Sequence, residues 1–411
     1  MQRLILLIVV FSGLFMNVQA KKLKVGTYRA LLTLDESNNT VLPFNFDLSY
    51  ENKKPRITIR NAGEKISVDE IRQDKDSLFF KMPVFDTEFR CKIKGNVWEG
   101  VWINHYRKEK NKIPFTAYYN QSQRFETKAL ASAESVEGRW EVLFKGQNGS
   151  GTKAIGVFHH IEQSAFVYGT FLTETGDYRY LEGVLNGNQF LLSCFDGSHA
   201  FLFQATLKDR EHLEGTFYSG SHWKENWIGF KNDSAKLRNP DEITYVKNKD
   251  SVLAFNYQDT KGHWVSSADE AFKNKVILVQ LMGSWCPNCM DESRYLKQVY
   301  EKYNSMGLEI VALAFEKSAD PEKSRAQVER MKSRLELPYP VLITQKTGKD
   351  KASETLPFLN EIAAFPTTIF LDRSRNIVKI HTGFNGPATG SAYTDFVKET
   401  EMLIERLLEQ Q

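Results

Sequence analysis

Cysteine is scarce in this chain, and net charge is nearly absent. Only four of the 411 residues are cysteines, so the fold does not depend on a framework of disulfides. The 54 basic and 51 acidic residues leave a formal charge of +3, which argues against a dedicated nucleic-acid-binding surface. The length allows two or three domains with sizeable cores. We therefore expect a multidomain protein without a nucleic-acid partner.

The N-terminal apolar run is short for a membrane-spanning helix. It covers residues 4–16, whereas a membrane span needs about 20 residues. Arg3 precedes the run, and Val18 and Ala20 fit the minus-three and minus-one positions of a signal-peptidase site. We therefore expect residues 1–20 to be a secretory signal peptide cleaved after Ala20, with an uncleaved membrane anchor as the alternative. Either one exports the rest of the chain, and the periplasm is the expected compartment.

Two of the cysteines, Cys286 and Cys289, are separated by two residues and follow an apolar run of strand length at 276–279. Apolar residues at intervals of three and four then predict a helix from near Cys286 to near Gly307. A helix N-terminus stabilises a thiolate and lowers a cysteine pKa to roughly 3.5–7.5, from about 8.5. We assign Cys286 as the nucleophile and Cys289 as the resolving thiol of a dithiol–disulfide cycle.

A structural disulfide or half of a zinc site is the alternative for this pair. Zinc would need two more Cys or His ligands, and the other cysteines, Cys91 and Cys194, lie far upstream. We interpret Cys91 and Cys194 as buried free thiols, although a disulfide between them stays open. Because the pair at 286 and 289 itself carries the electrons, neither a metal nor a bound cofactor is expected.

Residues 21–232 have the pattern of an all-β region. Short runs of aromatic and β-branched residues alternate with Gly, Asn and Asp clusters, and no long helix is indicated. Similar short motifs recur about 110 residues apart. The matching anchors are Gly26 and Gly138, Phe85 and Phe195, and Gly100 and Gly215. We predict two related units, 21–130 and 131–232, each a small antiparallel barrel or sandwich.

The β-rich half is also rich in tryptophan, which suggests either a binding surface or a packed core. Core and edge packing are the commoner use of such side chains, so packing is the favoured interpretation. The residues concerned are Trp98, Trp102, Trp140, Trp223 and Trp227.

Residues 233–250 are polar, contain Asn239-Pro240 and are predicted to be a linker. Residues 251–411 then alternate strands with helices, and they end with two closely spaced strands and an amphipathic helix. The expected strands are 276–281, 308–314, 341–343, 368–371 and 377–381, and the last helix is marked by Phe396, Thr400, Leu403 and Leu407. This order predicts an α/β thioredoxin-like domain after the all-β half.

Two motifs allow a family to be named. The segments 279–292 and 364–372 carry Trp285-Cys286-Pro287-Asn288-Cys289 and Phe365-Pro366-Thr367. Together they resemble the TlpA/ResA family of exported thiol:disulfide reductases over roughly residues 250–411. The resemblance implies that Pro366 is a cis proline facing the disulfide, with the Phe365 backbone exposed to an extended substrate.

The resemblance also implies an acidic residue near the cysteines, and Glu292 matches it. On a helix Glu292 and Cys289 occupy adjacent positions of one face, so the carboxylate could take and return the thiol proton. A solvated helical Glu is the alternative. Gln280 is a departure, because it stands where thioredoxins have a buried Asp and many relatives have Asn. Glutamine cannot accept the proton, which leaves Glu292 or water.

The substrate is expected to contact the residues around the cysteines and the cis proline. For Gly383, packing explains the glycine as well as a contact with the substrate does. The expected contacts are Trp285, Pro287, Phe365, Thr367 and Gly383.

These observations predict an exported oxidoreductase that reduces protein disulfides and is itself reduced by an upstream thiol donor, expected at the membrane. Asn288 supplies no positive charge between the cysteines, which favours reduction over oxidation. A thioredoxin-fold peroxidase is one alternative, but Gly283 stands where such a site has Thr or Ser. A β-domain binding or scaffolding protein with an accessory redox domain is the other.

Overall fold

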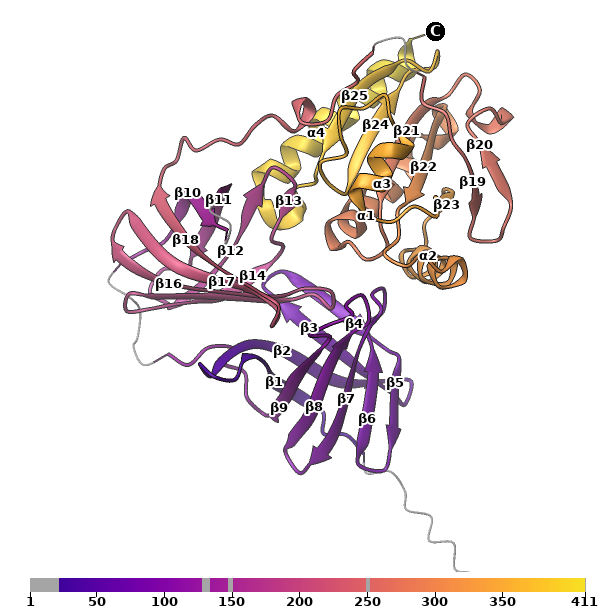
Figure 1. Ribbon diagram of the computed structural model, residues 1–411. Coiled ribbons are helices and arrows are strands. Elements are labelled where there is room, and N and C mark those ends of the chain that lie inside the picture. Colours follow the sequence, from indigo (N-terminus) through magenta and orange to yellow (C-terminus); the bar gives the residue numbers. More distant parts are fainter. Residues whose placement is uncertain (1–21, 128–133, 147–150, 249–251, 411) are drawn as a thin grey trace, which may run out of the picture.

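The computed structural model describes residues 22–127, 134–146, 151–248 and 252–410. The predicted signal peptide and its cleavage site lie outside the described residues. Within these ranges, none of the helices has the length and apolar character that crossing a bilayer requires. Figure 1 shows one sheet at the bottom, a second at the centre left and an α/β domain at the top right.

The first sheet has nine antiparallel strands in the order β4-β3-β2-β1-β9-β8-β7-β6-β5. Side chains alternate between a buried and a more exposed face, as in β1, because successive residues of a strand point to opposite sides. The strands are β1 Gly26–Asp35, β2 Thr40–Glu51, β3 Lys54–Asn61, β4 Glu64–Val68, β5 Ile71–Asp74, β6 Ser77–Lys81, β7 Thr87–Lys94, β8 Val97–Asn104 and β9 Lys112–Tyr119.

The second sheet closes on itself. Its order is β11-β10-β18-β17-β16-β15-β14-β12-β13, and β11 also pairs with β12, so that eight strands form a ring around a separate aromatic core. The strands are β10 Gly138–Lys145, β11 Gly151–His160, β12 Phe166–Thr173, β13 Gly176–Asp177, β14 Leu181–Asn186, β15 Gln189–Phe195, β16 Ala200–Asp209, β17 His212–Ser219 and β18 Trp223–Lys231.

Both sheets pair their first strand with their last, and the sequence anchors fall at corresponding places. Gly100 in β8 and Gly215 in β17 each face the preceding strand across the sheet. A Cβ atom would lie 2.0 Å from the Arg90 oxygen at the first glycine and 2.3 Å from the Gln204 oxygen at the second. The same close approach thus requires glycine in both units, which supports a duplication.

The two upstream cysteines and most of the tryptophans are packing residues. Cys91 and Cys194 are buried and free, as the favoured interpretation expected. Four of the five tryptophans are buried in the two cores. Trp223 is the exception, since 41% of it is exposed.

The predicted linker is attached to the C-terminal domain. Its short helix η1 (Pro240–Glu242) places Asp241 2.7 Å from the ring of His381 and 2.9 Å from the ammonium of Lys379. Farther along, Val246 forms a β-bridge with Leu359. The segment therefore fixes the exit from the β-rich half against the domain that follows.

The C-terminal domain is built on a sheet in the order β20-β19-β23-β22-β21-β24-β25. Its interior strand β21 (Val276–Met282) is buried along its whole length and runs parallel to β22 (Leu308–Ala314). The other strands are β19 Asn256–Asp259, β20 Trp264–Ser266, β23 Val341–Ile343, β24 Thr367–Leu371 and β25 Ile377–Thr382. The hairpin of β19 and β20 was not predicted, whereas the remaining strands follow the expected segments.

Four helices accompany this sheet, and the first begins at the cysteine pair. They are α1 Pro287–Tyr303, α2 Pro321–Leu335, α3 Gly348–Thr355 and α4 Ser391–Glu409, with the short turns η2 Glu270–Phe272, η3 Asn304–Met306 and η4 Pro387–Thr389. Gly307 ends the first helical segment with a φ of 108°, a conformation that favours glycine. The predicted class, an all-β half followed by a thioredoxin-like domain, is confirmed.

Candidate active site

The cysteine pair lies at the N-terminus of α1, directly after the buried strand β21. Cys286 is the N-cap residue, and the backbone N–H of Cys289 points at its sulfur at 3.2 Å. The two cysteines form a disulfide across the first turn. Cys286 is 7% exposed and Cys289 is fully buried. The first sulfur is therefore the one that an incoming disulfide can reach.

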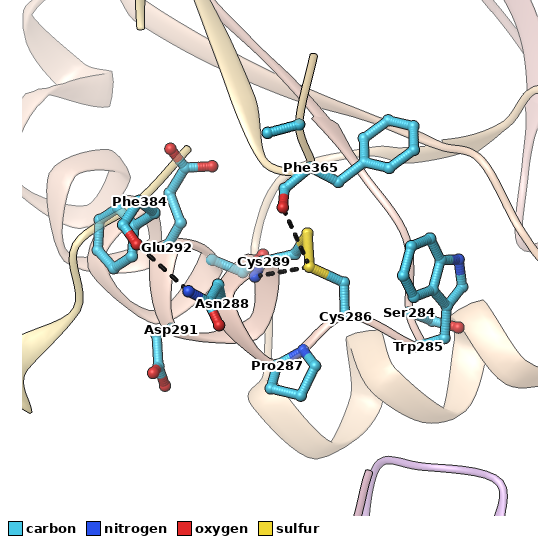
Figure 2. The surroundings of a disulfide bond; sticks show 12 residues. Ser284, Trp285, Cys286, Pro287, Asn288, Cys289, Asp291, Glu292, Phe365 and Phe384 are labelled. Carbon is cyan, nitrogen blue, oxygen red and sulfur yellow. Dashed lines mark hydrogen bonds between the residues drawn. A yellow bond between two sulfur atoms is a disulfide. The ribbon is translucent and has the colours of Figure 1, made fainter. Parts of the chain in front are cut away.

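The Phe365–Pro366 peptide bond is cis, as the family resemblance implied. It places the backbone oxygen of Phe365 3.5 Å from the sulfur of Cys286 (Figure 2). Thr367 is fully buried and donates its hydroxyl hydrogen bond to Ala364 at 2.9 Å. The segment 364–367 is thus fixed beside the disulfide, with the Phe365 carbonyl as its polar group nearest the sulfur.

Glu292 lies on the Cys289 side of the disulfide and is only 1% exposed (Figure 2). Its two carboxylate oxygens accept hydrogen bonds from Gln280 at 2.7 Å and from Thr368 at 2.8 Å. Burial raises the pKa of Glu292 from 4.5 to about 7, and the two hydrogen bonds oppose that rise. The solvated alternative for Glu292 is wrong, and the residue is a buried carboxyl that changes charge near neutral pH.

Gln280 joins the carboxylate to the cysteine turn. Its side-chain amide is fully buried and donates to the backbone oxygen of Cys289 at 3.3 Å as well as to Glu292. Its own oxygen accepts from the Ser293 hydroxyl at 3.0 Å. The departure from the family pattern therefore has a clear structural use, because an amide can donate to Glu292 where an ionised Asp could not.

The residues before Cys286 are held by a second buried carboxyl. Glu316 accepts from the Ser284 backbone at 2.8 Å and from its hydroxyl at 2.7 Å. The indole N–H of Trp285 donates to the Phe315 oxygen at 3.0 Å, and its ring meets the Phe365 ring edge-on. These contacts leave Trp285 half-buried at the rim of the site, close to Cys286.

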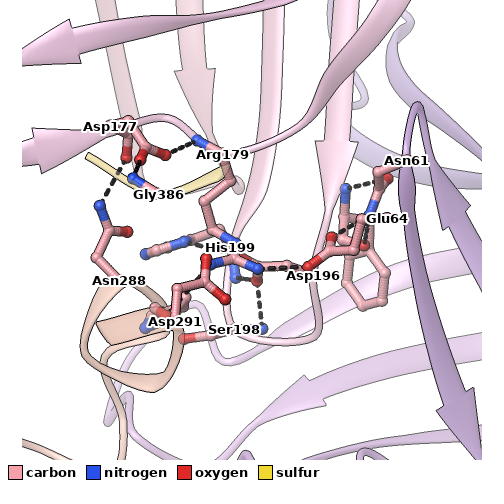
Figure 3. Close-up of polar contacts among 12 residues, drawn as sticks. Asn61, Glu64, Asp177, Arg179, Asp196, Ser198, His199, Asn288, Asp291 and Gly386 are labelled. Carbon is pink, nitrogen blue, oxygen red and sulfur yellow. Dashed lines mark hydrogen bonds and ion pairs between the residues drawn. The ribbon is translucent and has the colours of Figure 1, made fainter. Parts of the chain in front are cut away.

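The β-rich half reaches this site through Arg179, which is fully buried. Its guanidinium donates to the backbone oxygen of Pro287 at 3.2 Å and forms ion pairs with Glu64, Asp196 and Asp291. Figure 3 shows the arginine between the two β units and the first turn of α1. Burial opposes its charge, but the surrounding carboxylates outweigh that effect and raise the pKa of Arg179. One arginine thereby links all three parts of the chain at the cysteine motif.

Other contacts from the second sheet cover the flank of the motif. The side-chain amide of Asn288 donates to the backbone oxygen of Asp177 at 3.1 Å, and the Ser198 hydroxyl donates to the backbone oxygen of Trp285 at 3.2 Å. Gly383 lies so close to Thr175 that a Cβ would meet its backbone at 2.9 Å.

The structure thus brings the expected residues into one site. Some of them border the disulfide, whereas others are in contact with the β-rich half. Trp285 and Phe365 border the disulfide, the Pro287 carbonyl is occupied by Arg179, and Gly383 packs against the β-rich half. The sequence analysis missed Arg179, which lies 108 positions before Pro287 in a strand-rich segment with no distinguishing motif.

A thioredoxin fold, a CxxC disulfide at a helix N-terminus, a facing cis proline and a buried carboxyl define a thiol-disulfide oxidoreductase. Comparison with known proteins agrees with this class. Residues 247–395 match the family model described as Redoxin. The chain therefore carries a Redoxin domain in its C-terminal part.

The curated relatives are thiol-disulfide oxidoreductases named ResA. The protein of Geobacillus kaustophilus is 29% identical over 142 residues, which are 34% of this chain and 73% of the relative. That of Bacillus subtilis is 24% identical over 147 residues, or 36% of this chain and 74% of the relative. The C-terminal domain is thus homologous to the ResA proteins.

Solved structures also resemble a part of the chain. A thiol-disulfide oxidoreductase from Bacteroides fragilis has 20% identity and a TM-score of 0.29, and the match covers 36% of this chain and 98% of that one. A thiol:disulfide interchange protein of the thioredoxin family from Chlorobium tepidum has 20% identity and a TM-score of 0.29, with 41% and 99% covered.

Proposed function

We propose that this chain is an exported thiol:disulfide reductase that acts on disulfides of other proteins. The observation that carries the proposal is the accessible sulfur of Cys286 at the start of α1, backed by Cys289 and the buried carboxyl of Glu292. The names of the ResA relatives support thiol-disulfide chemistry. The signal-like segment 1–20 supports export.

The reaction begins with the reduced pair. The Cys286 thiolate attacks one sulfur of the substrate disulfide, the substrate S–S bond breaks, and its other sulfur leaves as a thiolate that takes a proton. The positive end of α1 and the N–H of Cys289 stabilise the attacking thiolate. The product of this step is a mixed disulfide between Cys286 and the substrate.

The second step releases the substrate. Cys289 loses its proton and attacks the Cys286 sulfur, so the mixed disulfide breaks and the second substrate thiolate leaves and is protonated. Glu292 takes the proton of Cys289, because a carboxyl with a pKa of about 7 can accept a proton and pass it on at neutral pH. The enzyme ends with the disulfide of Cys286 and Cys289, and the substrate has gained two electrons and two protons, one proton from Cys289 by way of Glu292 and the other from water.

The pair must then be reduced by another protein, since a compartment outside the cytoplasm does not supply reductant to a lone CxxC. We assign this task to a thiol donor at the membrane. The reducing direction is supported by Asn288, whose neutral amide bonds to Asp177 and adds no charge between the cysteines.

Insulin reduction tests the proposal. The mature chain with dithiothreitol should precipitate the insulin B chain, Cys286→Ser should abolish the acceleration, and Cys91→Ala, which removes a thiol remote from the site, should keep it. Equal activity of wild type and Cys286→Ser would refute the assignment. A midpoint potential near about −270 mV, as in thioredoxin, supports reduction, whereas one near about −120 mV, as in DsbA, contradicts it.

Trapping addresses the substrates. A Cys289→Ser variant cannot resolve the mixed disulfide, so it should accumulate proteins bound through Cys286 that dithiothreitol releases. The double variant with Cys286→Ser is the control and should hold none. Traps that stay empty under native export conditions would speak against protein disulfides as the substrates.

A further inference from the structure

A cavity of about 330 Å³ lies where both β units meet the rim of the active site. Each of the three parts of the chain contributes to its wall. The lining residues that matter here are Tyr106 and Arg107 from the first unit, His222 and Glu225 from the second, and Trp285 and Lys317 from the C-terminal domain. A volume at the low end of the range for ligand sites, about 300–1,000 Å³, suits one or two side chains of a substrate.

The cavity is bordered by Trp285, the residue directly before the attacking cysteine. Trp285, which precedes Cys286 in the chain, is half-buried between the cavity and the ring of Phe365. The Ser198 hydroxyl, also in the cavity wall, fixes the Trp285 carbonyl at 3.2 Å. A substrate whose disulfide reaches Cys286 therefore places its neighbouring groups at this cavity.

Two cations line the cavity without a carboxylate partner. In the part of the chain that the structure describes, Arg107 and Lys317 form no ion pair within 4.0 Å, and the polar partner of Arg107 is the His222 ring at 2.5 Å. The Lys317 ammonium lies 4.3 Å from the Trp285 ring centre and 5.5 Å from that of Tyr106. Aromatic rings hold this lysine in place but do not neutralise it.

The protonation states agree with a positive cavity. Burial and then Arg107 lower the pKa of His222 to about 4, so the ring is neutral and accepts the hydrogen bond from Arg107. Burial and then Arg107 lower the pKa of Lys317 to about 8, so the ammonium is mostly charged at pH 7. Both shifts have a common cause, the confinement of positive charge away from water.

The carboxylates near the cavity do not cancel these charges. Glu316, beside Lys317 in sequence, partly offsets the charge of that lysine and raises its pKa, but Glu316 is buried and directs both oxygens at Ser284. Glu225 lines the cavity, where its charge adds to the effect of burial in raising the pKa of Tyr178. Two cations thus face one carboxylate, and the balance favours an anionic guest.

We propose that this cavity binds a carboxylate of the disulfide substrate, held by Arg107 and Lys317 while the substrate disulfide lies at Cys286. The inference rests on the proposed function and names its substrate class: disulfides with an acidic group close to the reacting cysteine. Arginine suits this task because its planar fork matches the two oxygens of a carboxylate. Either an acidic peptide or a small disulfide such as glutathione disulfide can supply this group.

Paired substrates test the proposal on the full mature chain, reduced and freed of reductant. Two cyclic peptide disulfides differ only in Glu or Gln beside one cysteine, and quenched-flow chromatography follows their reduction at pH 7. Wild type should reduce the Glu peptide at least about tenfold faster, as expected for one or two charge-assisted hydrogen bonds. Arg107→Gln and Lys317→Gln should bring the ratio close to one, and Arg107→Lys should restore part of it.

Lys112→Gln is the matched control, because Lys112 is an exposed lysine of β9 outside the cavity wall; it should keep the wild-type ratio. Glutathione disulfide and its methyl ester form a second pair of substrates. The pair whose ratio of reduction rates falls in Arg107→Gln shows whether a peptide or glutathione supplies the carboxylate. Equal rates within both pairs in wild type, or ratios that Arg107→Gln and Lys317→Gln leave unchanged, would overturn the cavity proposal while the reductase stands. Failure to reduce any of the four disulfides would instead refute the reductase itself, and the cavity proposal with it.

Discussion

Arg179 of the second β unit donates a hydrogen bond to the backbone oxygen of Pro287, the residue that follows Cys286, at 3.2 Å. The same guanidinium forms ion pairs with a carboxylate of each part of the chain: Glu64, Asp196 and Asp291. The β-rich half is therefore part of the environment of the cysteine pair and cannot be treated as a separate appendage.

Arg179→Gln should weaken the junction of the three parts. Breaking a buried ion pair by removing one partner costs about 3–5 kcal/mol, because the remaining carboxylates are left buried and unpaired. We expect a lower melting temperature and faster proteolytic cleavage near the segment 233–248. Arg210→Gln, which removes an exposed arginine paired with Glu134 outside this segment, is the control and should change neither measurement. Two variants with identical melting temperatures would show that Arg179 does not hold the junction.

Replacing Glu292 with Gln should slow the resolving step. The variant keeps the shape of the side chain but cannot take the Cys289 proton, and loss of a positioned acid–base group typically costs about 10²–10⁴-fold in rate. In wild type the rate should rise with pH through about 7, as the carboxyl ionises; in Glu292→Gln this inflection should disappear. Single-turnover reduction of a peptide disulfide between pH 5 and 9 measures both. Glu301→Gln, on the exposed side of α1, should behave as wild type.

Glu292 should also make stability depend on pH. Its folded-state pKa of about 7 exceeds the ordinary value of 4.5, so the folded protein holds this proton more tightly than the unfolded chain does. The associated stability is complete below about pH 4.5 and is lost as pH rises through 7, with a total on the order of 3 kcal/mol. Urea unfolding of Glu292→Gln should show a flatter profile between these pH values. If the stability of Glu292→Gln depended on pH as that of wild type does over this range, a group other than Glu292 would cause the pH dependence.

The hydrogen bonds to Glu292 should tune its pKa. Gln280 and Thr368 both donate to the carboxylate and favour its charged form. Gln280→Met and Thr368→Val should each raise the pKa of Glu292 by about one unit, since a hydrogen bond to a charged group is worth about 1.5–3 kcal/mol. The pH–rate inflection should move to higher pH in both variants, and carbon-13 NMR of the carboxyl group can follow it directly. An inflection that moves to lower pH would contradict hydrogen bonds from Gln280 and Thr368 to the Glu292 carboxylate.

The local parts of this site were predictable from sequence, and the long-range parts were not. The strand before Cys286 and the helix after it follow from apolar runs and spacings within some thirty residues, where periodicity is informative. The cis bond at Pro366 and the nearness of Glu292 came from the family resemblance. The sequence showed only that Gln280 cannot accept the thiol proton. Its role as a hydrogen-bond donor to Glu292 depends on its burial against β24, which the sequence does not report.

The contribution of the β-rich half has no counterpart in a local pattern. Arg179 and Arg107 stand in ordinary strand and turn sequence, more than 100 positions before the residues they approach at the site. Their importance arises from packing between separate sheets, which periodicity within one segment does not report. The recurring motifs were detectable because Gly100 and Gly215 both mark a close approach of strands that only glycine permits.

Gly383 offers a test of whether the β-rich half contacts the C-terminal domain beside the cysteine pair in solution. The residue has a φ of +78°, and a Cβ would lie 2.9 Å from the backbone of Thr175. Gly383→Ala therefore meets both an unfavourable backbone conformation, which costs about 1–3 kcal/mol, and a clash with the second β unit. We expect a lower melting temperature, and hydrogen exchange should report faster exchange in residues 173–180. Gly390→Ala is the control, because it has a similar φ of +62° with no atom within 4 Å of its Cβ position. If Gly383→Ala left exchange in residues 173–180 as slow as Gly390→Ala does, the close contact with Thr175 would not exist in solution.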